Sequence, residues 1–132
     1  MSAVTVRHLG GDRFGIGIRD HEVVVDQPAA LGGEDTAPTP TELFVASLTA
    51  CVAFYARRSL TRHDLPVEGL EVTADFRTET TPSRVSDVDI AIRLPDGVPE
   101  ERRAALLAVA SHCTVHSSLT APPSVEMAFR EG

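Results

Sequence analysis

Two cysteines, Cys51 and Cys113, give this sequence its clearest capacity for redox chemistry. A thiolate is a strong nucleophile, and two thiols that meet in space can form a disulfide. The cysteines are 62 positions apart, so their spacing does not say whether they meet. Cys51 lies in the apolar segment PTPTELFVASLTACVAFYARRSL, residues 38–60, where an inert buried thiol is the ordinary expectation. Any chemistry at Cys51 therefore depends on side chains that the fold brings to it.

Arginine is the side chain most available to activate such a thiol, since all 12 basic residues are arginines. The absence of lysine excludes Schiff-base chemistry. Cys51 is expected about twelve residues into a helix, too far from the N-terminus for the helix dipole to stabilise a thiolate there.

A zinc site is an alternative that the histidines leave open. Cys113 and His116 are three positions apart and could bind a metal from one helical turn, with Cys51 and either His63 or His112 completing four ligands. A single Cys-x-x-His pair is a weak signal, because the second ligand pair has no recognisable spacing. We therefore expect no metal.

The segment that holds Cys51 begins with strong signals for a helix. Thr39 is expected as the N-cap, Pro40 as the first helical residue, and Glu42 completes a capping box three residues after the cap. The helix is predicted to run to about His63. Over 43–56 almost no polar side chain interrupts it, so none of its faces is suited to water. A homodimer with this helix near its centre is predicted, because contiguous exposed apolar surface is rare on monomers.

The rest of the chain predicts strands before this helix and both strands and helices after it. Alternating apolar residues mark the strands, and glycine and proline mark the turns. The expected strands are 3–9, 13–18, 22–26, 67–79, 84–94 and 124–131, and a helix is expected over 99–112 with a further turn near 112–119. We predict an α+β fold with antiparallel sheets around central buried helices.

Length and charge are typical of a single acidic domain. The chain has 132 residues, 42% of them hydrophobic, and a net charge of −7, which argues against binding to nucleic acid or anionic membranes. The N-terminus has no signal-peptide pattern, and the apolar run over 43–56 is shorter than the ~18 residues that span a bilayer. A single domain over 1–132 is expected in the cytoplasm, without a membrane partner.

Two motifs together give the sequence a family resemblance. GGEDTAPTPTELFVASLTAC, residues 32–51, followed about sixty residues later by CTVHSSL, resembles the OsmC-like family, which includes osmotically inducible protein C and the organic hydroperoxide resistance proteins. The resemblance covers most of the chain and both cysteines. It implies an intertwined α+β homodimer in which two sheets wrap the central helices.

The activity that the resemblance implies is that of a thiol peroxidase acting on apolar organic hydroperoxides in oxidative-stress defence. Cys51 would become a sulfenic acid, and Cys113 would condense with it to a disulfide. An external dithiol would regenerate the pair, so no bound cofactor is implied. Arg19 would stabilise the thiolate, and Glu42 would hold the arginine in place.

Departures from the family pattern leave alternatives open. Arg19 lacks the adjacent glycines of the hydroperoxide branch, and Arg13 is the alternative to it. Glu42 lies nine residues before the first cysteine, whereas that branch has its glutamate ten before, where Thr41 stands here. Glu42 is therefore either a helix cap or a catalytic helper. The frequent proline after the second cysteine is Thr114 here. A non-catalytic small-molecule binding or redox-sensing protein that keeps the cysteine pair is the alternative function.

Overall fold

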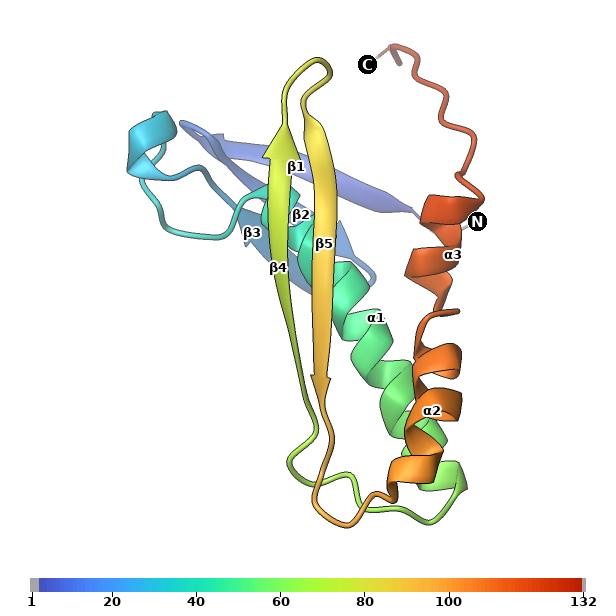
Figure 1. The fold of residues 1–132 in the computed structure, drawn as a ribbon. Coiled ribbons are helices and arrows are strands. Elements are labelled where there is room, and N and C mark those ends of the chain that lie inside the picture. The colour runs from blue at the N-terminus through green and yellow to red at the C-terminus, as the bar shows by residue number, and fades with distance from the viewer. Residues whose placement is uncertain (1–2, 132) are drawn as a thin grey trace. The chain divides into compact units, whose positions relative to one another are not determined.

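The computed structural model describes residues 3–131 (Figure 1). The chain divides into two compact units. The N-terminal unit is Met1–Ala46 and the C-terminal unit is Ser47–Gly132, so the division falls within the long helix α1. The order of elements, β-β-β-α-β-β-α-α with two short 3-10 helices, confirms the α+β prediction. The single domain over 1–132 stays a prediction.

An antiparallel sheet forms the first part of the N-terminal unit. Its strands are β1 (Val4–Gly10), β2 (Arg13–Ile18) and β3 (His21–Val25), in that order. Each begins and ends within one residue of its predicted bounds. A two-residue turn joins β2 to β3, and its first residue, Arg19, has a φ of 53°.

A buried carboxylate fixes the loop between β3 and α1, which contains the 3-10 helix η1 (Ala29–Leu31). Asp26 is 1% exposed and accepts hydrogen bonds from Thr36 Oγ1 at 2.7 Å, Thr36 N at 3.0 Å and Gln27 N at 2.7 Å. These bonds, the Thr36 hydroxyl first, lower the pKa of Asp26 to about 2. Asp26 N also donates to Pro38 O at 3.1 Å, so this residue joins both ends of the loop just before α1.

Helix α1 spans Pro40–Arg62 and starts with the predicted capping box. Glu42 N donates to Thr39 Oγ1 at 3.0 Å, and Thr39 N donates to Glu42 Oε1 at 2.8 Å. Two backbone donors that have no partner within the helix are satisfied in this way. The predicted start of the helix is confirmed, and its end lies one residue before the predicted one.

Helix α1 is apolar on more than one side. Leu48, Val52 and Leu60 are buried, whereas Phe54 is 52% exposed. By length and composition alone α1 would qualify as a membrane span, with a mean hydropathy of 1.2 over its most apolar window. This is weak evidence, because the core helix of a soluble protein passes the same test.

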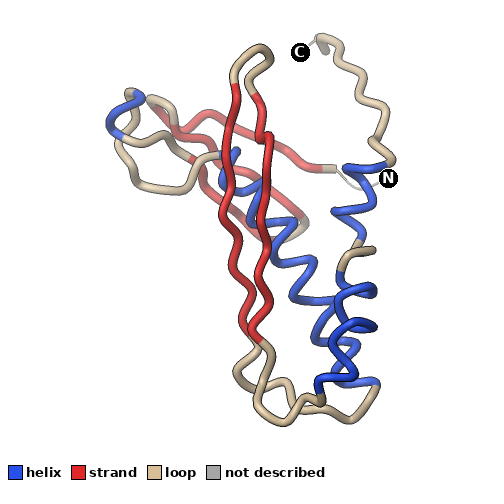
Figure 2. The backbone as a smooth tube through the Cα atoms, in the orientation of Figure 1, coloured by secondary structure: helices blue, strands red, loops and turns tan. Residues whose placement is uncertain are grey.

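The C-terminal unit packs a hairpin and two further helices against α1. The hairpin strands are β4 (Glu71–Glu79) and β5 (Arg84–Arg93), and they are followed by the 3-10 helix η2 (Glu100–Arg102), α2 (Arg103–Ala110) and α3 (Thr114–Thr120) (Figure 2). The predicted apolar face of the hairpin is confirmed, since its members face one another across the strands as Val72 with Ile92, Ala74 with Ile90, and Phe76 with Val88.

Two buried clusters connect α1 with the hairpin and α2. The first contains Leu48 and Val52 of α1, Ala110 of α2, and Cys113. The second contains Ala56, Leu60 and Leu106. Ile92 of β5 packs against both, so the hairpin and the two helices share one continuous apolar contact.

Some helices and strands begin or end at other residues than predicted, because a side-chain hydrogen bond or a turn ends the element. The helix expected over 99–112 begins as a 3-10 turn and ends at Ala110, where Ser111 Oγ and His112 Nδ1 each donate to a carbonyl of the last turn at 2.7 Å. The strand expected from residue 67 begins at Glu71, because a turn containing Gly69 at a φ of 93° precedes it. The turn expected near 112–119 is helix α3.

The strand predicted over 124–131 is wrong for this chain. Residues 122–131 have no regular secondary structure. Val125, Met127 and Phe129, the apolar positions of the alternating pattern, are 71%, 93% and 107% exposed. A strand needs a neighbour for its backbone hydrogen bonds, and none of the described strands pairs with this segment.

Candidate functional site

The structure brings the two cysteines together, between α1 and the corner that joins α2 to α3. Cys51 packs against the buried cluster that contains Cys113, and it is close enough to Cys113 to raise the pKa of that thiol. Cys51 is half-buried, whereas Cys113 is 0% exposed. Cys51 is therefore the thiol that a dissolved molecule can reach.

The surroundings of Cys113, at the start of α3, favour the protonated form of its thiol. Cys113 is the N-cap of this helix, and its Sγ accepts a hydrogen bond from His116 N at 3.4 Å. Burial raises the pKa of the Cys113 thiol, the neighbouring Cys51 raises it further, and the His116 N–H acts in the opposite direction. A protonated, inaccessible thiol suits a residue that reacts second, after its neighbour has been oxidised.

Two side-chain hydrogen bonds hold the corner around Cys113. His116 Nδ1 donates to Ser111 O at 2.5 Å, across the corner. The hydroxyls of Tyr55 and Thr114 lie 3.0 Å apart and connect the corner to α1. Sequence reasoning missed both bonds. The sequence does place Tyr55 near the thiols, because Tyr55 follows Cys51 by four positions and residues four apart lie on one face of a helix.

The other predicted site residues lie in the N-terminal unit. Arg19 is exposed in the turn between β2 and β3. Arg13 begins β2, and its Nε is buried with no hydrogen-bond partner among the residues described. Glu42 is part of the capping box at the start of α1. Catalytic roles for Arg19 and Glu42 stay predictions.

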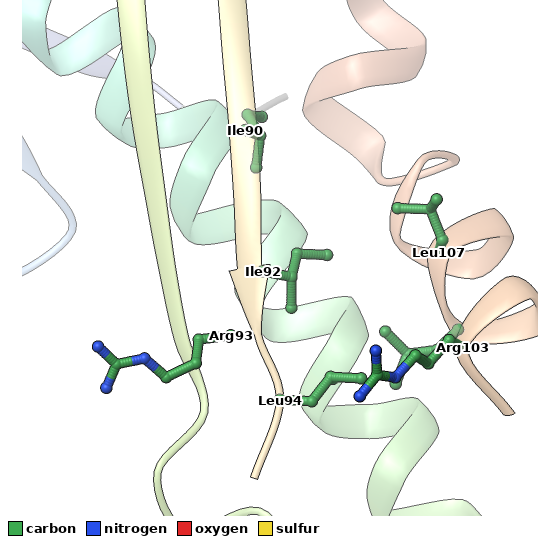
Figure 3. Close-up of a pocket in the computed structure, with 7 residues that line it drawn as sticks. Ile90, Ile92, Arg93, Leu94, Arg103 and Leu107 are labelled. Carbon is green, nitrogen blue, oxygen red and sulfur yellow. The ribbon is translucent and has the colours of Figure 1, made fainter. Parts of the chain in front are cut away.

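A hollow of about 430 Å³, lined by aliphatic side chains and two arginines, lies between β5 and α2, beside the cysteine cluster. In Figure 3, Ile92 of β5 points toward α2, and Leu107 points back toward β5. Leu94, Leu106 and two arginines complete the lining; the Arg103 side chain lies beside Leu94, whereas that of Arg93 points away from α2 (Figure 3). Ile90 and Ile92 also pack against the cluster that contains Cys113, so they form a wall common to the hollow and the thiols.

The zinc interpretation finds no support in the described part of the chain. Within residues 3–131, no group of three or more His, Cys, Asp and Glu side chains is placed to hold a metal ion. His63, His112 and His116 each donate Nδ1–H to a backbone carbonyl at 2.5–2.8 Å.

Solved structures of bacterial proteins share the fold. A proposed osmotic stress induced and detoxification response protein from Psychrobacter arcticus matches with a TM-score of 0.83 and 23% identity, over 89% of this chain and 88% of that chain. An organic hydroperoxide resistance protein from Legionella pneumophila matches with a TM-score of 0.64 and 22% identity, over 89% and 88%. The organic hydroperoxide resistance protein OhrB of Bacillus subtilis matches with a TM-score of 0.63 and 19% identity, over 92% of both chains. At these identities the likeness shows the fold.

A family model extends the comparison to the sequence. No curated protein matches this chain at a significant level. The model of the family described as OsmC-like protein matches residues 32–128, a span that includes both cysteines. Members of this family are soluble proteins, and the low identities fit a divergent branch. This match over most of the sequence and the shared fold show that the chain belongs to the OsmC-like protein family.

Proposed function

We propose that this protein is a cysteine-based peroxidase that reduces organic hydroperoxides, as part of oxidative-stress defence in the cytoplasm. The observation that carries the proposal is a pair of neighbouring thiols with unequal exposure: Cys51 is half-buried and Cys113 is fully buried. Two of the proteins that share the fold are named organic hydroperoxide resistance proteins, which supports the same reading.

The proposed reaction has one oxidation by the hydroperoxide, one condensation that forms the disulfide, and one reduction by an external dithiol. The Cys51 thiolate attacks the hydroperoxide, so that an S–O bond forms, the O–O bond breaks, and the alkoxide leaves as an alcohol after taking a proton. The Cys113 sulfur then attacks the Cys51 sulfenic acid, so that the disulfide forms and water leaves. An external dithiol reduces the disulfide by thiol exchange and is itself oxidised.

An arginine is proposed to stabilise the Cys51 thiolate and the charge on the departing oxygen. The resemblance implies Arg19, and Arg13 is the alternative. The structure favours Arg13, because its Nε is buried without a hydrogen-bond partner among residues 3–131. A buried donor of this kind is stabilised by a hydrogen bond to an anion such as a thiolate. Arg13→Ala and Arg19→Ala variants distinguish the two, since the residue that acts at the thiol is the one whose loss slows Cys51 oxidation.

The substrate class is an apolar hydroperoxide. The hollow between β5 and α2 offers Ile90, Ile92 and Leu107 to an alkyl or aryl group, next to the cluster that holds the thiols. We expect cumene hydroperoxide to be consumed faster than hydrogen peroxide, which has no apolar group to bury. Equal rates with both would contradict this substrate class.

We also propose a homodimer. Phe54 of α1 is 52% exposed, and the alternating segment 122–131 is uncovered. Among the described strands β5 pairs with β4 alone, so its other edge offers backbone groups to an extended segment. Light scattering at micromolar concentration is expected to give the mass of two chains, and deletion of 122–132 to lower the dimer's stability. A monomeric mass for the full chain would exclude the dimer.

The test of the function is a comparison of two cysteine variants. Cys51→Ser is expected to abolish hydroperoxide consumption. Cys113→Ser is expected to form a sulfenic acid that dimedone traps, but no intramolecular disulfide. Full turnover by the Cys51→Ser protein would refute the proposal. A wild-type protein that consumes no hydroperoxide would favour the binding or redox-sensing alternative.

A further inference from the structure

A hydrogen bond connects the elements that carry the two cysteines. Tyr55 lies one turn after Cys51 on α1, and Thr114 directly follows Cys113. Their hydroxyl oxygens are 3.0 Å apart, across 59 positions of sequence. Each hydroxyl of this bond therefore belongs to a residue that lies within one helical turn of a cysteine.

Both ends of the bond are held by their surroundings. The Tyr55 ring packs against the cluster that contains Cys113, and it meets the Phe54 ring edge-on with the centroids 5.7 Å apart. Thr114 is the first residue of α3, and the His116 ring ties this turn to Ser111 O. Because Cys113 is the N-cap of the same turn, a shift of Thr114 moves the Cys113 sulfur as well.

Disulfide formation requires narrow geometry, with Cα atoms about 4.4–6.8 Å apart and Cβ atoms about 3.5–4.5 Å apart. On the basis of the proposed function, we infer that Tyr55 is a positioning residue that holds Cys113 against Cys51, so that the Cys51 sulfenic acid condenses with Cys113 before a second hydroperoxide oxidises it. The favoured step forms the S–S bond and releases water. The competing step transfers a second oxygen to the same sulfur, gives a sulfinic acid, and releases an alcohol.

The test measures sulfenic acid formation and disulfide formation separately. In a Cys113→Ser background, Tyr55→Phe is expected to leave dimedone-trapped sulfenic acid formation unchanged. With Cys113 present, rapid quenching and mass spectrometry should show disulfide formation slowed about threefold to tenfold, the range expected for one lost hydrogen bond. The sulfinic acid fraction under excess cumene hydroperoxide should rise in parallel.

Variants of Thr114 and Ser118 provide the controls. Thr114→Val should slow disulfide formation as Tyr55→Phe does, Thr114→Ser should restore most of the rate, and the double variant should be no slower than either single one. Ser118→Ala removes a hydroxyl that donates to Thr114 O within α3 at 2.9 Å, and it should behave as the wild type. An unchanged rate in both Tyr55→Phe and Thr114→Val, or additive effects in the double variant, would overturn the inference.

Equilibration with glutathione buffers tests the same geometry without hydroperoxide. Tyr55→Phe is expected to shift the equilibrium between disulfide and dithiol about threefold to tenfold toward the dithiol. If the wild type forms the disulfide in these buffers but not with hydroperoxide, the proposed function fails and this shift decides the inference. If the wild type forms no disulfide in either experiment, the inference is wrong.

Discussion

Replacing Glu42 with glutamine separates helix capping from catalysis, because glutamine keeps the capping oxygen and loses the charge. In the structure Thr39 N donates to Glu42 Oε1 at 2.8 Å, and a glutamine oxygen can accept the same bond. Thr39→Ala is the matched variant. It removes the hydroxyl that accepts from Glu42 N at 3.0 Å and leaves the charge of Glu42 in place.

The structure sets the expected size of each effect. Thr39→Ala should lower the free energy of unfolding by about 1 kcal/mol, the usual cost of losing an N-cap side chain. Glu42→Gln loses the attraction between a carboxylate and the N-terminus of a helix, about 0.3–1 kcal/mol. Because Glu42 is exposed, its loss should fall near the lower end of that range.

Urea unfolding followed by circular dichroism measures both free energies, and consumption of cumene hydroperoxide with an external dithiol measures activity. If Glu42 is a helix cap, Glu42→Gln keeps a rate close to that of the wild type, and Thr39→Ala is the less stable of the two. A rate reduced about tenfold or more in Glu42→Gln, which is about 1.4 kcal/mol of barrier, at nearly unchanged stability would refute a role limited to capping. It would place Glu42 in the catalytic site.

Three further predictions concern the core, the loop before α1 and the thiols. Leu60→Ala, at a side chain that is 0% exposed, should lower the free energy of unfolding by about 3–5 kcal/mol in urea titrations; a loss below about 1 kcal/mol would mean that this cluster is not a packed core. The hydrogen bonds that lower the pKa of Asp26 from 3.8 to about 2 stabilise the folded protein above pH 3.8, and this contribution is lost as the pH falls toward about 2. The urea midpoint should therefore fall over this pH range. In Asp26→Asn the midpoint should depend less on pH. Iodoacetamide at pH 8 should label Cys51 well before Cys113, because Cys113 is buried and its pKa is raised; peptide mapping that finds equal labelling would contradict the proposed order of reaction.

Local patterns in the sequence predicted most of the secondary structure. The capping box at Thr39 and Glu42 depends on residues three positions apart, so it could be read directly and is confirmed. The alternation that places Val72 and Ile92 on one face of the hairpin is equally local. The strand expected over 124–131 failed because a strand also needs a partner edge, which local alternation does not supply.

The candidate site was predicted in part. The sequence identified Cys51 and Cys113 as the chemical groups, and the family resemblance implied their pairing. It gave no indication that Cys113 would be fully buried while Cys51 stays half-buried, although the proposed order of reaction rests on this difference. The burial of each cysteine depends on how α1, the hairpin and α2 pack together, so it cannot be predicted from any one segment of the sequence.

The sequence by itself determined the residue types, the start of α1 and the apolar character of that helix, because these depend on neighbours within a few positions. The tertiary structure decided that the two thiols meet, that Tyr55 reaches Thr114, and that Ile90 and Ile92 line both the hollow and the thiol cluster. These contacts join residues that are tens of positions apart. They form because burying the apolar faces of α1, β5 and α2 together is favourable, and the direction of each polar side chain follows from that packing.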